Sequence, residues 1–345
     1  MKKYLHLIIL IAFFSCEEEV IINLDNDNNN IVVEGAIEPG FPAYVMLTRS
    51  EGYFDPVNSN TYNELFIDDA SVFIKRDDDL QHELTLITED IIAQLEFILG
   101  QDINIPANTI YIDLEFLNKK DAFNQAGRSY SLEINWNNQI ITAETTIPEP
   151  TPLDCLWVEK NEIIDDKDYK CDIRAVYSDP ANIQNNILIR SKRVDHWEKD
   201  SSCTSQQIID PRMILVDAGS DILAEGQQFE TFFPRPNPDG GFPNGVYNAS
   251  HYKKCKGGQD SVFIKEDVVL IKFCQIDAEA LKFWRAVVRQ AGSGGNPFAE
   301  PMNLPSNING GLGAWTGYAP VYYRIPIIKD TIFNESVTPN ITDIF

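Results

Sequence analysis

The chain has 345 residues, of which 43% are hydrophobic and 11% aromatic, and it carries a formal net charge of -24. This composition is too apolar for a disordered polymer, and the length suggests two domains that each bury a core. Binding to a phosphate backbone depends on Lys and Arg, so the acidity argues against nucleic acid as a partner.

Residues 1–15 have the composition of a secretory signal peptide. Two lysines precede an apolar run over residues 4–14, and the small Ser15 stands directly before Cys16. The run is too short to span a bilayer as a helix. A cysteine at this place resembles a bacterial lipoprotein signal, so we expect cleavage before Cys16 and acyl chains on its thiol. Several acyl chains make a durable membrane anchor. The alternative is an ordinary secreted protein with a chance cysteine.

Three acidic residues, Glu17, Glu18 and Glu19, follow the cysteine at once. An acidic cluster here resembles the signal that exports lipoproteins of Bacteroidota to the outer face of the outer membrane. The alternative is that these carboxylates are only the solvated start of a tether. Residues 16–30 are predicted to be this tether. The Asp/Asn run at its end lacks the glycine and the glutamate that a calcium loop requires.

Residues 31–150 show short alternating strands separated by turn signals. One hairpin is predicted over 130–147, with Asn137 and Asn138 at its turn, and another over 70–87. Regularly spaced short strands with no long helical period predict an Ig-like β-sandwich. The only stretch in this region whose pattern suits a helix instead of a strand is the short segment from residue 90 to 99.

Three alternating prolines, Pro148, Pro150 and Pro152, mark the expected domain boundary. They enforce an extended backbone and remove hydrogen-bond donors. Charge supports the division. Residues 16–150 contain 26 acidic and 6 basic residues, a net of -20, whereas residues 151–345 contain 26 and 20, a net of -6. The first domain is therefore the acidic one.

A second β-rich domain is predicted over residues 151–345. It opens with strands and contains two segments rich in Pro and Gly, 234–245 and 296–313. One clear helix is expected after Asp277, a good N-cap residue that is followed by apolar residues at helical spacing. The predicted fold class is therefore mainly β, an N-terminal Ig-like β-sandwich plus a second β-rich domain that carries one helix.

The sequence contains no recognisable catalytic or metal-binding motif. His82, His196 and His251 belong to no ligand cluster, and the glycines of residues 311–317 have the wrong interval for a dinucleotide fingerprint. No serine lies in a nucleophile elbow. The paired carboxylates of a glycoside hydrolase are spaced only in three dimensions, so this class stays open in a chain with 52 acidic residues. We expect no catalytic residue, no metal and no cofactor.

Five cysteines follow the predicted lipid anchor, and in an oxidising compartment they favour disulfides. Because five is odd, at least one thiol is left over or pairs between molecules. Cys274, inside an apolar run, is the expected buried free thiol. Cys155 and Cys171 are candidates to bridge neighbouring strands, and Cys203 and Cys255 are candidates to join two polar loops.

Two hydroxyl residues are candidates for modification. Ser261 and Thr331 each follow an aspartate and precede an apolar residue. This pattern resembles the O-glycosylation motif of Bacteroidota. The alternative is that these three-residue matches arise by chance and that both hydroxyls are bare.

Five short sequences are distinctive when they occur together. They are residues 32–35, 69–72, 143–148, 295–301 and 306–313, and the last two are the most specific. With them the mature chain resembles an uncharacterised lipoprotein family of Bacteroidota, often encoded beside TonB-dependent outer-membrane receptors. The resemblance implies a compartment and neighbours but no activity.

We therefore predict an outer-membrane lipoprotein that faces the cell exterior. It would act as a non-enzymatic accessory or docking subunit of an outer-membrane β-barrel of the TonB-dependent receptor type, with Phe298, Trp315 and Tyr318 as candidate partner contacts. The alternative function is that of a surface glycan-binding lipoprotein, with Trp197, Trp315 or Tyr318 as a platform for a sugar. The segment 296–313 is expected either to bind the partner or only to cover the end of the sandwich.

Overall fold

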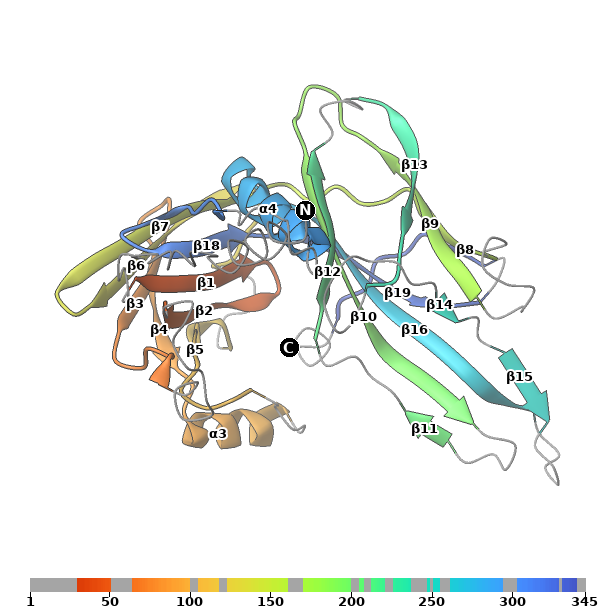
Figure 1. Ribbon diagram of the computed structural model, residues 1–345, viewed down its shortest axis with the longest axis horizontal. Helices are drawn as coiled ribbons and strands as arrows, with labels where there is room; N and C mark the ends of the chain where they lie inside the picture. The colour runs from red at the N-terminus through yellow and green to blue at the C-terminus, as the bar shows by residue number, and fades with distance from the viewer. Residues whose placement is uncertain are drawn as a thin grey trace, which may run out of the picture.

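The computed structural model describes residues 30–50, 64–99, 105–117, 123–160, 170–199, 205–207, 212–220, 226–236, 247–248, 251–254, 261–293, 303–328 and 331–339. Within these ranges the protein is mainly β, with strands in three sheets and two α-helices, α3 (Glu89–Leu99) and α4 (Ala278–Ser293) (Figure 1). The prediction of a mainly β chain with one clear helix in its second half is confirmed. Neither helix is long and apolar enough to cross a membrane.

The first unit is a nine-stranded sheet that follows the order β17-β7-β6-β3-β4-β5-β2-β1-β18. Seven of its strands come from the N-terminal half of the chain and two from near the C-terminus. A short 3-10 helix, η1 (Glu115–Leu117), follows β5. The strands are β1 (Ile31–Glu38), β2 (Phe41–Arg49), β3 (Ser71–Arg76), β4 (Gln81–Leu86), β5 (Ile110–Ile112), β6 (Arg128–Trp136), β7 (Gln139–Ile147), β17 (Ile308–Asn309) and β18 (Leu312–Gly317).

Two hairpins of the first unit are those that the sequence predicts. In the turn between β6 and β7, Asn137 and Asn138 have φ of 49° and 61°. Two residues with positive φ give a turn whose twist matches the flanking strands, and asparagine tolerates this conformation. Strands β3 and β4 form the other hairpin, with Val72 opposite Leu84. Residues 90–99, the short stretch with a helical pattern in this half of the sequence, lie in helix α3.

Strands β17 and β18 nearly close the first sheet on itself. They are consecutive in the chain but lie at opposite ends of the strand order: β17 pairs antiparallel with β7, and β18 pairs parallel with β1. Gly313 has φ of +102°, and a Cβ there would lie 2.0 Å from the carbonyl oxygen of Val33. Residues 308–317 fall in the second domain of the sequence-based division, yet they complete the first sheet.

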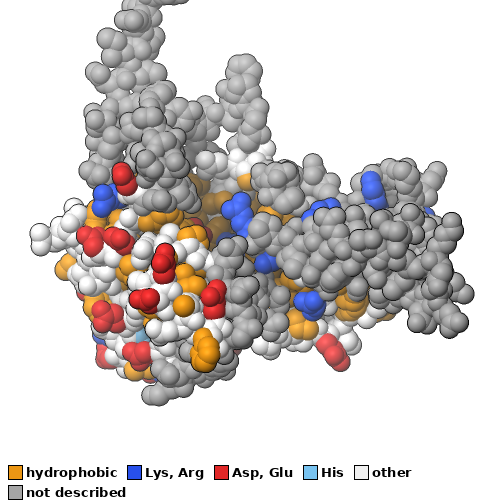
Figure 2. Space-filling model, turned by 90° about the horizontal axis from the view of Figure 1, so that it is seen from below, with side chains coloured by type: hydrophobic (Ala, Val, Ile, Leu, Met, Phe, Trp, Pro, Cys, Tyr) orange, Lys and Arg blue, Asp and Glu red, His pale blue; other side chains and the backbone are white. Residues whose placement is uncertain are grey.

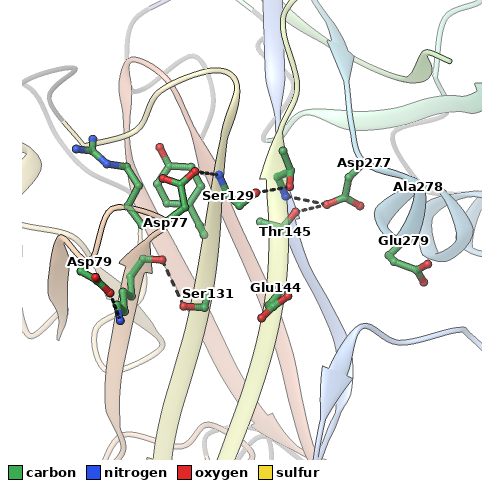
Figure 3. Close-up of a pocket in the computed structure, with 13 residues that line it drawn as sticks. Asp77, Asp79, Ser129, Ser131, Glu144, Thr145, Asp277, Ala278 and Glu279 are labelled. Carbon is green, nitrogen blue, oxygen red and sulfur yellow. Dashed lines mark hydrogen bonds and ion pairs between the residues drawn. The ribbon is translucent and has the colours of Figure 1, made fainter. Parts of the chain in front are cut away.

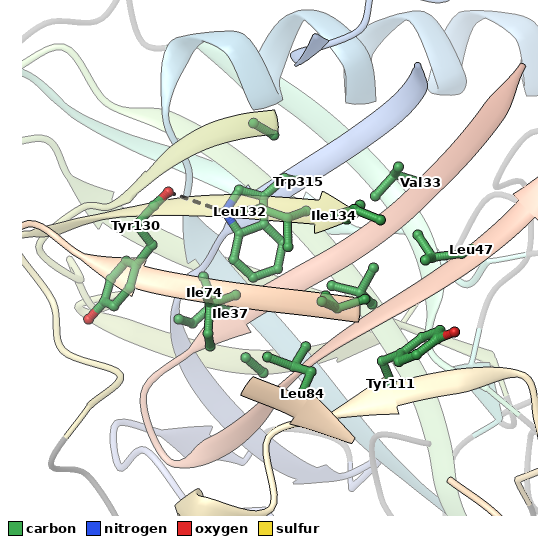
Figure 4. Close-up of a cluster of buried hydrophobic side chains, with 14 of the residues drawn as sticks. Val33, Ile37, Leu47, Ile74, Leu84, Tyr111, Tyr130, Leu132, Ile134 and Trp315 are labelled. Atoms are coloured by element: carbon green, nitrogen blue, oxygen red, sulfur yellow. Dashed lines mark hydrogen bonds between the residues drawn. The ribbon is translucent and has the colours of Figure 1, made fainter. Parts of the chain in front are cut away.

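The nearly closed sheet surrounds one apolar core (Figure 4). Trp315 from β18 is fully buried among side chains from β1, β3 and β6, and its indole Nε1 donates a hydrogen bond to the Tyr130 carbonyl oxygen at 3.3 Å. Gly35 of β1 makes room for this ring, because a Cβ there would lie 2.7 Å from the indole. The first unit therefore depends on a residue from the far end of the chain.

The second unit consists of two further sheets with an apolar core between them. Leu156, Ile173, Phe273 and Tyr323 are among its buried residues. The six-stranded sheet contains β10 (Asn186–Lys199), β11 (Ser205–Gln207), β12 (Ile214–Ser220), β15 (His251–Lys254), β16 (Ser261–Gln275) and β19 (Ala319–Pro326). The five-stranded sheet contains β8 (Cys155–Lys160), β9 (Lys170–Ser178), β13 (Gln228–Phe233), β14 (Tyr247–Asn248) and β20 (Ile332–Phe333).

Helix α4 lies at the seam where the two units meet (Figure 1). Its first turn is capped by Asp277, whose Oδ1 accepts a hydrogen bond from the Ala280 amide at 2.8 Å. The N-cap prediction is therefore confirmed. The buried face of the helix, with Leu281 and Trp284, packs against Ala36 of the first unit and Leu188 of the second. The buried face of the helix thus packs against side chains of both units.

Candidate functional site

A buried ion pair crosses the seam. Glu38 at the end of β1 accepts from Lys272 Nζ of β16 through Oε2, and both residues are about 5–6% exposed. The Tyr322 hydroxyl donates to the other carboxylate oxygen, Oε1, at 2.5 Å. Burial, and then the nearby Glu38 carboxylate, raise the pKa of Tyr322 well above its usual value, so the phenol stays protonated. The carboxylate is therefore fully engaged.

A cavity of about 140 Å³, here called the junction pocket, opens beside this pair. Residues of both units line it, including Glu38, Phe41, Arg190, Arg212, Met213 and Lys272. Three of these carry a positive charge and one a negative charge. In a chain with a net charge of -24, this recess is locally cationic.

Arg190 of β10 lines the junction pocket, and the Glu34 carboxylate interacts with it electrostatically. Its guanidinium stacks on Trp284 at 4.5 Å from the ring centroid. Its Nε is buried and finds no hydrogen-bond acceptor among the residues that the structure describes. Lys272 lies directly opposite on β16, with its Nζ 4.3 Å from the Tyr318 ring centroid. Two like charges therefore face each other across the ladder, an arrangement that costs stability.

A wider groove of about 510 Å³ follows β6 and β7 to the start of α4 (Figure 3). Asp277 spans it: Oδ2 accepts hydrogen bonds from Thr145 Oγ1 at 2.6 Å and from the Thr146 amide at 3.0 Å. Since Oδ1 caps α4, this carboxylate is satisfied by protein groups. Asp77, Asp79, Glu144 and Glu279 also line the groove. At the end of the groove near α4, the two units are in contact through the hydrogen bonds of Asp277 to β7.

The outer face of the five-stranded sheet carries a row of four side chains. Phe232 of β13 is opposite Arg174 of β9, which is opposite Trp157 of β8, which is opposite Ile332 of β20. Phe232 is 57% exposed and Ile332 71%, with the half-buried Arg174 and Trp157 between them. We call these four residues the outer row. Arg174 is held by ion pairs of 2.6 Å with Glu159 and Glu230.

No group of three or more His, Cys, Asp and Glu residues suited to a metal ion occurs in the described part of the chain. His82 Nδ1 lies 2.9 Å from Asp113 Oδ2, and its ring stacks on Phe123 with centroids 3.9 Å apart. The His82 ring is thus packed in the first unit. The side chains of His196 and His251 lie outside the described residues.

Two of the three predicted partner contacts are wrong as surface residues. Trp315 is 0% exposed and Tyr318 is 4% exposed, so neither presents a face to a protein or a sugar. Trp315 is buried because β18 enters the first sheet, and Tyr318 because it packs at the seam beside Arg190 and Lys272. The third contact, Phe298, lies outside the described residues, as do Cys16, Glu17, Glu18 and Glu19. Trp197 lies in β10.

The predicted bridge between Cys155 and Cys171 is also wrong. Cys155 is opposite Val176 at one end of the β8–β9 ladder, and Cys171 is opposite Lys160 at the other. Five rungs at about 3.3 Å place them far beyond the reach of a disulfide. Cys274 is a buried free thiol, as predicted, and burial raises its pKa to about 12. Cys203 and Cys255 lie outside the described residues.

The glycosylation candidates lie at strand ends of the second unit. Ser261 begins β16, and Thr331 precedes β20, where its carbonyl oxygen accepts a 3.3 Å hydrogen bond from the Val158 amide. Thr331 is half-buried, next to the exposed Ile332. The side chain of Ser261 is outside the described residues.

The sequence analysis did not single out Glu38, Arg190 and Lys272. One signal pointed to the last of them, because Lys272 interrupts a nearly continuous apolar run over 268–276. A lysine within a buried strand needs a partner, since a buried charge is costly unless it is paired. The identity of that partner, Glu38, depends on how the two units meet.

The sequence was compared with known proteins and protein families. No curated protein matches it. A family described as "Domain of unknown function (DUF4249)" matches residues 17–324. The match covers both units, including the strands that return to the first sheet. The chain therefore belongs to the DUF4249 family.

Proposed function

We propose that the protein is a lipid-anchored accessory subunit at the outer membrane, exposed to the cell exterior and docked to an outer-membrane β-barrel protein of the TonB-dependent receptor type. The N-terminal sequence supports the anchor, through Cys16 and the acidic residues that follow it. The outer row supports the docking role, and it is the observation on which the proposal rests most.

The outer row has the features of a docking surface. The inward side chains of its strands, such as Leu156 and Ile173, fill the core, so the outer side chains have no structural need to be apolar. Nevertheless, Phe232, Trp157 and Ile332 line up across the outer face. Aromatic residues and Arg are enriched at protein interfaces, and such patches mark interaction sites.

The two units differ in surface charge, and the difference favours the second unit as the one that contacts the partner. Figure 2 shows acidic side chains gathered over the first unit, and basic side chains at the seam and over the second unit. The acidic unit would be repelled by another acidic surface. The second unit, which carries the outer row, is therefore the better candidate for contact. An anchor in the same membrane raises the effective concentration of the partner, so a modest interface is sufficient.

Glycan binding is the second candidate function, and the outer row favours it at the same place. Trp157 offers an aromatic ring, and Arg174, Glu159 and Glu230 offer hydrogen-bonding groups beside it. This combination suits the apolar face and the hydroxyls of a sugar. The two functions compete for one surface, so the same variants distinguish them.

The anchor is tested by replacing Cys16 with alanine. Without the thiol no acyl chain can be attached, so the variant should move from the detergent phase to the aqueous phase in a detergent partition experiment. The control is Cys155→Ala, which removes a thiol from β8 and should leave partitioning unchanged. An intact mass of the native protein that shows no acyl chains on Cys16 contradicts the anchor.

Docking is tested by the double variant Phe232→Ser with Ile332→Ser, purified in mild detergent from its native membrane. The wild type should co-purify with a β-barrel protein, and the double variant should lose it. Both positions are exposed, so folding should change by no more than about 0.5 kcal/mol each. The matched control is Ile140→Ser on β7 of the first unit, 66% exposed, which should keep the partner.

The same preparations decide between the two functions. If the wild type purifies alone and binds a glycan array in a way that Trp157→Ala abolishes, glycan binding replaces docking. If the double variant keeps the β-barrel protein, the outer row is not the contact.

A further inference from the structure

The junction pocket contains a cation, Arg190, that forms no ion pair among the described residues, although the Glu34 carboxylate interacts with it electrostatically. Its four charged lining residues are Glu38, Arg190, Arg212 and Lys272. Glu38 is engaged through both oxygens, by Lys272 and by Tyr322. No carboxylate among the described residues forms an ion pair with Arg190, and its buried Nε has no acceptor there. A buried donor without an acceptor is unfavourable, and an acceptor supplied by a ligand removes that cost.

Stacking on Trp284 fixes the plane of the Arg190 guanidinium and therefore the directions in which its N–H groups point. One face of the guanidinium lies over Trp284 at 4.5 Å, and the Tyr318 ring lies 6.0 Å away. Burial raises the pKa of Tyr318 far above its usual value, so this ring does not become an anion that could pair with Arg190. A guanidinium stacked in this way directs its N–H groups outward in its own plane, and the buried Nε is the one without an acceptor among the described residues.

We propose that the junction pocket binds a small carboxylate, with the carboxylate oxygens on Arg190 and a short apolar part against Phe41 and Met213. Arg190 supplies the two parallel donors that a carboxylate accepts. The exposed Arg212 at the pocket adds charge, and Phe41 and Met213 supply the apolar wall. This site goes beyond the docking role and does not depend on it.

The size of the pocket limits the size of the ligand. A cavity of about 140 Å³ is close to the ~150 Å³ of an apolar cavity that binds benzene, so it admits a small organic anion such as acetate or propionate. Inorganic phosphate fits the volume but carries no apolar part. As a dianion it would also be repelled by the Glu38 carboxylate in the lining. The lining thus favours a monocarboxylate.

The site also spans the two units, because Phe41 belongs to β2 and Arg190 to β10. A ligand that touches both should stabilise the seam. A ligand that binds the folded state but not the unfolded state raises the unfolding temperature as its concentration exceeds Kd. Ligand binding is therefore measurable both as heat and as an increase in thermal stability.

The test is titration of the detergent-purified protein with sodium propionate, with sodium chloride as the control for ionic strength. Isothermal calorimetry should show saturable binding, and thermal unfolding should shift to higher temperature. Arg190→Gln should weaken binding at least about tenfold, which corresponds to 1.4 kcal/mol. Arg285→Gln, the same change at an exposed position of α4, should leave Kd unchanged.

Arg212→Gln keeps the test valid if Arg190→Gln does not fold, because Arg212 is exposed and its replacement should not affect the core. It should weaken propionate binding measurably. The proposal fails if propionate and acetate give no saturable heat, if neither arginine variant changes Kd, or if phosphate binds more tightly than propionate. None of these outcomes bears on the outer row, whose failure is read from the loss of a protein partner.

Discussion

Replacing Trp315 with alanine should lower the free energy of unfolding by about 3–5 kcal/mol, the usual cost of removing a fully buried large aromatic side chain. The indole is 0% exposed and fills the centre of the first core, and its Nε1 is bonded to the Tyr130 carbonyl oxygen. Alanine would leave a cavity and would remove the hydrogen bond to the Tyr130 carbonyl oxygen. Urea unfolding followed by circular dichroism measures the loss.

Leu312→Ala is the matched control for this experiment. It lies in the same strand, β18, but its side chain is 44% exposed, so the expected change is below about 1 kcal/mol. If Trp315→Ala were as stable as Leu312→Ala, the indole would not be the core residue described here. Its role as a surface platform for a sugar or a partner would then have to be considered again.

Lys272→Met should cost about 3–5 kcal/mol, because it leaves the Glu38 carboxylate buried without its counter-ion. Methionine keeps most of the volume of the lysine stem, so the loss reports the charge rather than a cavity. Thermal or urea unfolding of the purified variant measures it. The seam should be affected first, since the pair joins β1 to β16.

The double variant Lys272→Met with Glu38→Gln separates the cost of an unpaired charge from the value of the pair. The glutamine amide has no charge to bury, and its oxygen still accepts from the Tyr322 hydroxyl. We expect the double variant to regain at least about 2 kcal/mol of the loss, since neutral replacements of buried pairs are often well tolerated. A double variant less stable than Lys272→Met would contradict this account.

The local elements could be predicted from the sequence because local patterns determine them. Period-two alternation and the turn residues Asn137 and Asn138 define the β6–β7 hairpin, and Asp277 with apolar residues at helical spacing defines α4. Positions 308–317 were different. Glycines occur both in the turns of a surface loop and in a strand that packs closely on a neighbouring strand, so the sequence of this segment fits either structure. Only the partner strand β1 distinguishes the two.

The candidate sites follow the same division. Phe232, Arg174, Trp157 and Ile332 come from four strands, and strand register alone brings them into one row. A sequence carries no direct record of register between distant strands. The junction pocket forms only where the two units contact each other, so its prediction also requires the placement of one unit on the other. Trp315 was predicted to be a surface contact, whereas the structure buries it: β18 packs closely on β1, and Gly35 of β1 makes room for the ring.

The parallel pairing of β18 with β1 has a consequence for how the chain folds. Strands β1 and β7 remain open edges until the residues up to 317 are available, and open edges are sites of wrong pairing and aggregation. Contacts between the two ends of a long chain also form slowly, because loop closure must come first. A chain that crosses a cell envelope from its N-terminus would therefore need protection during transit. Its two units would reach their final form together, as one late event.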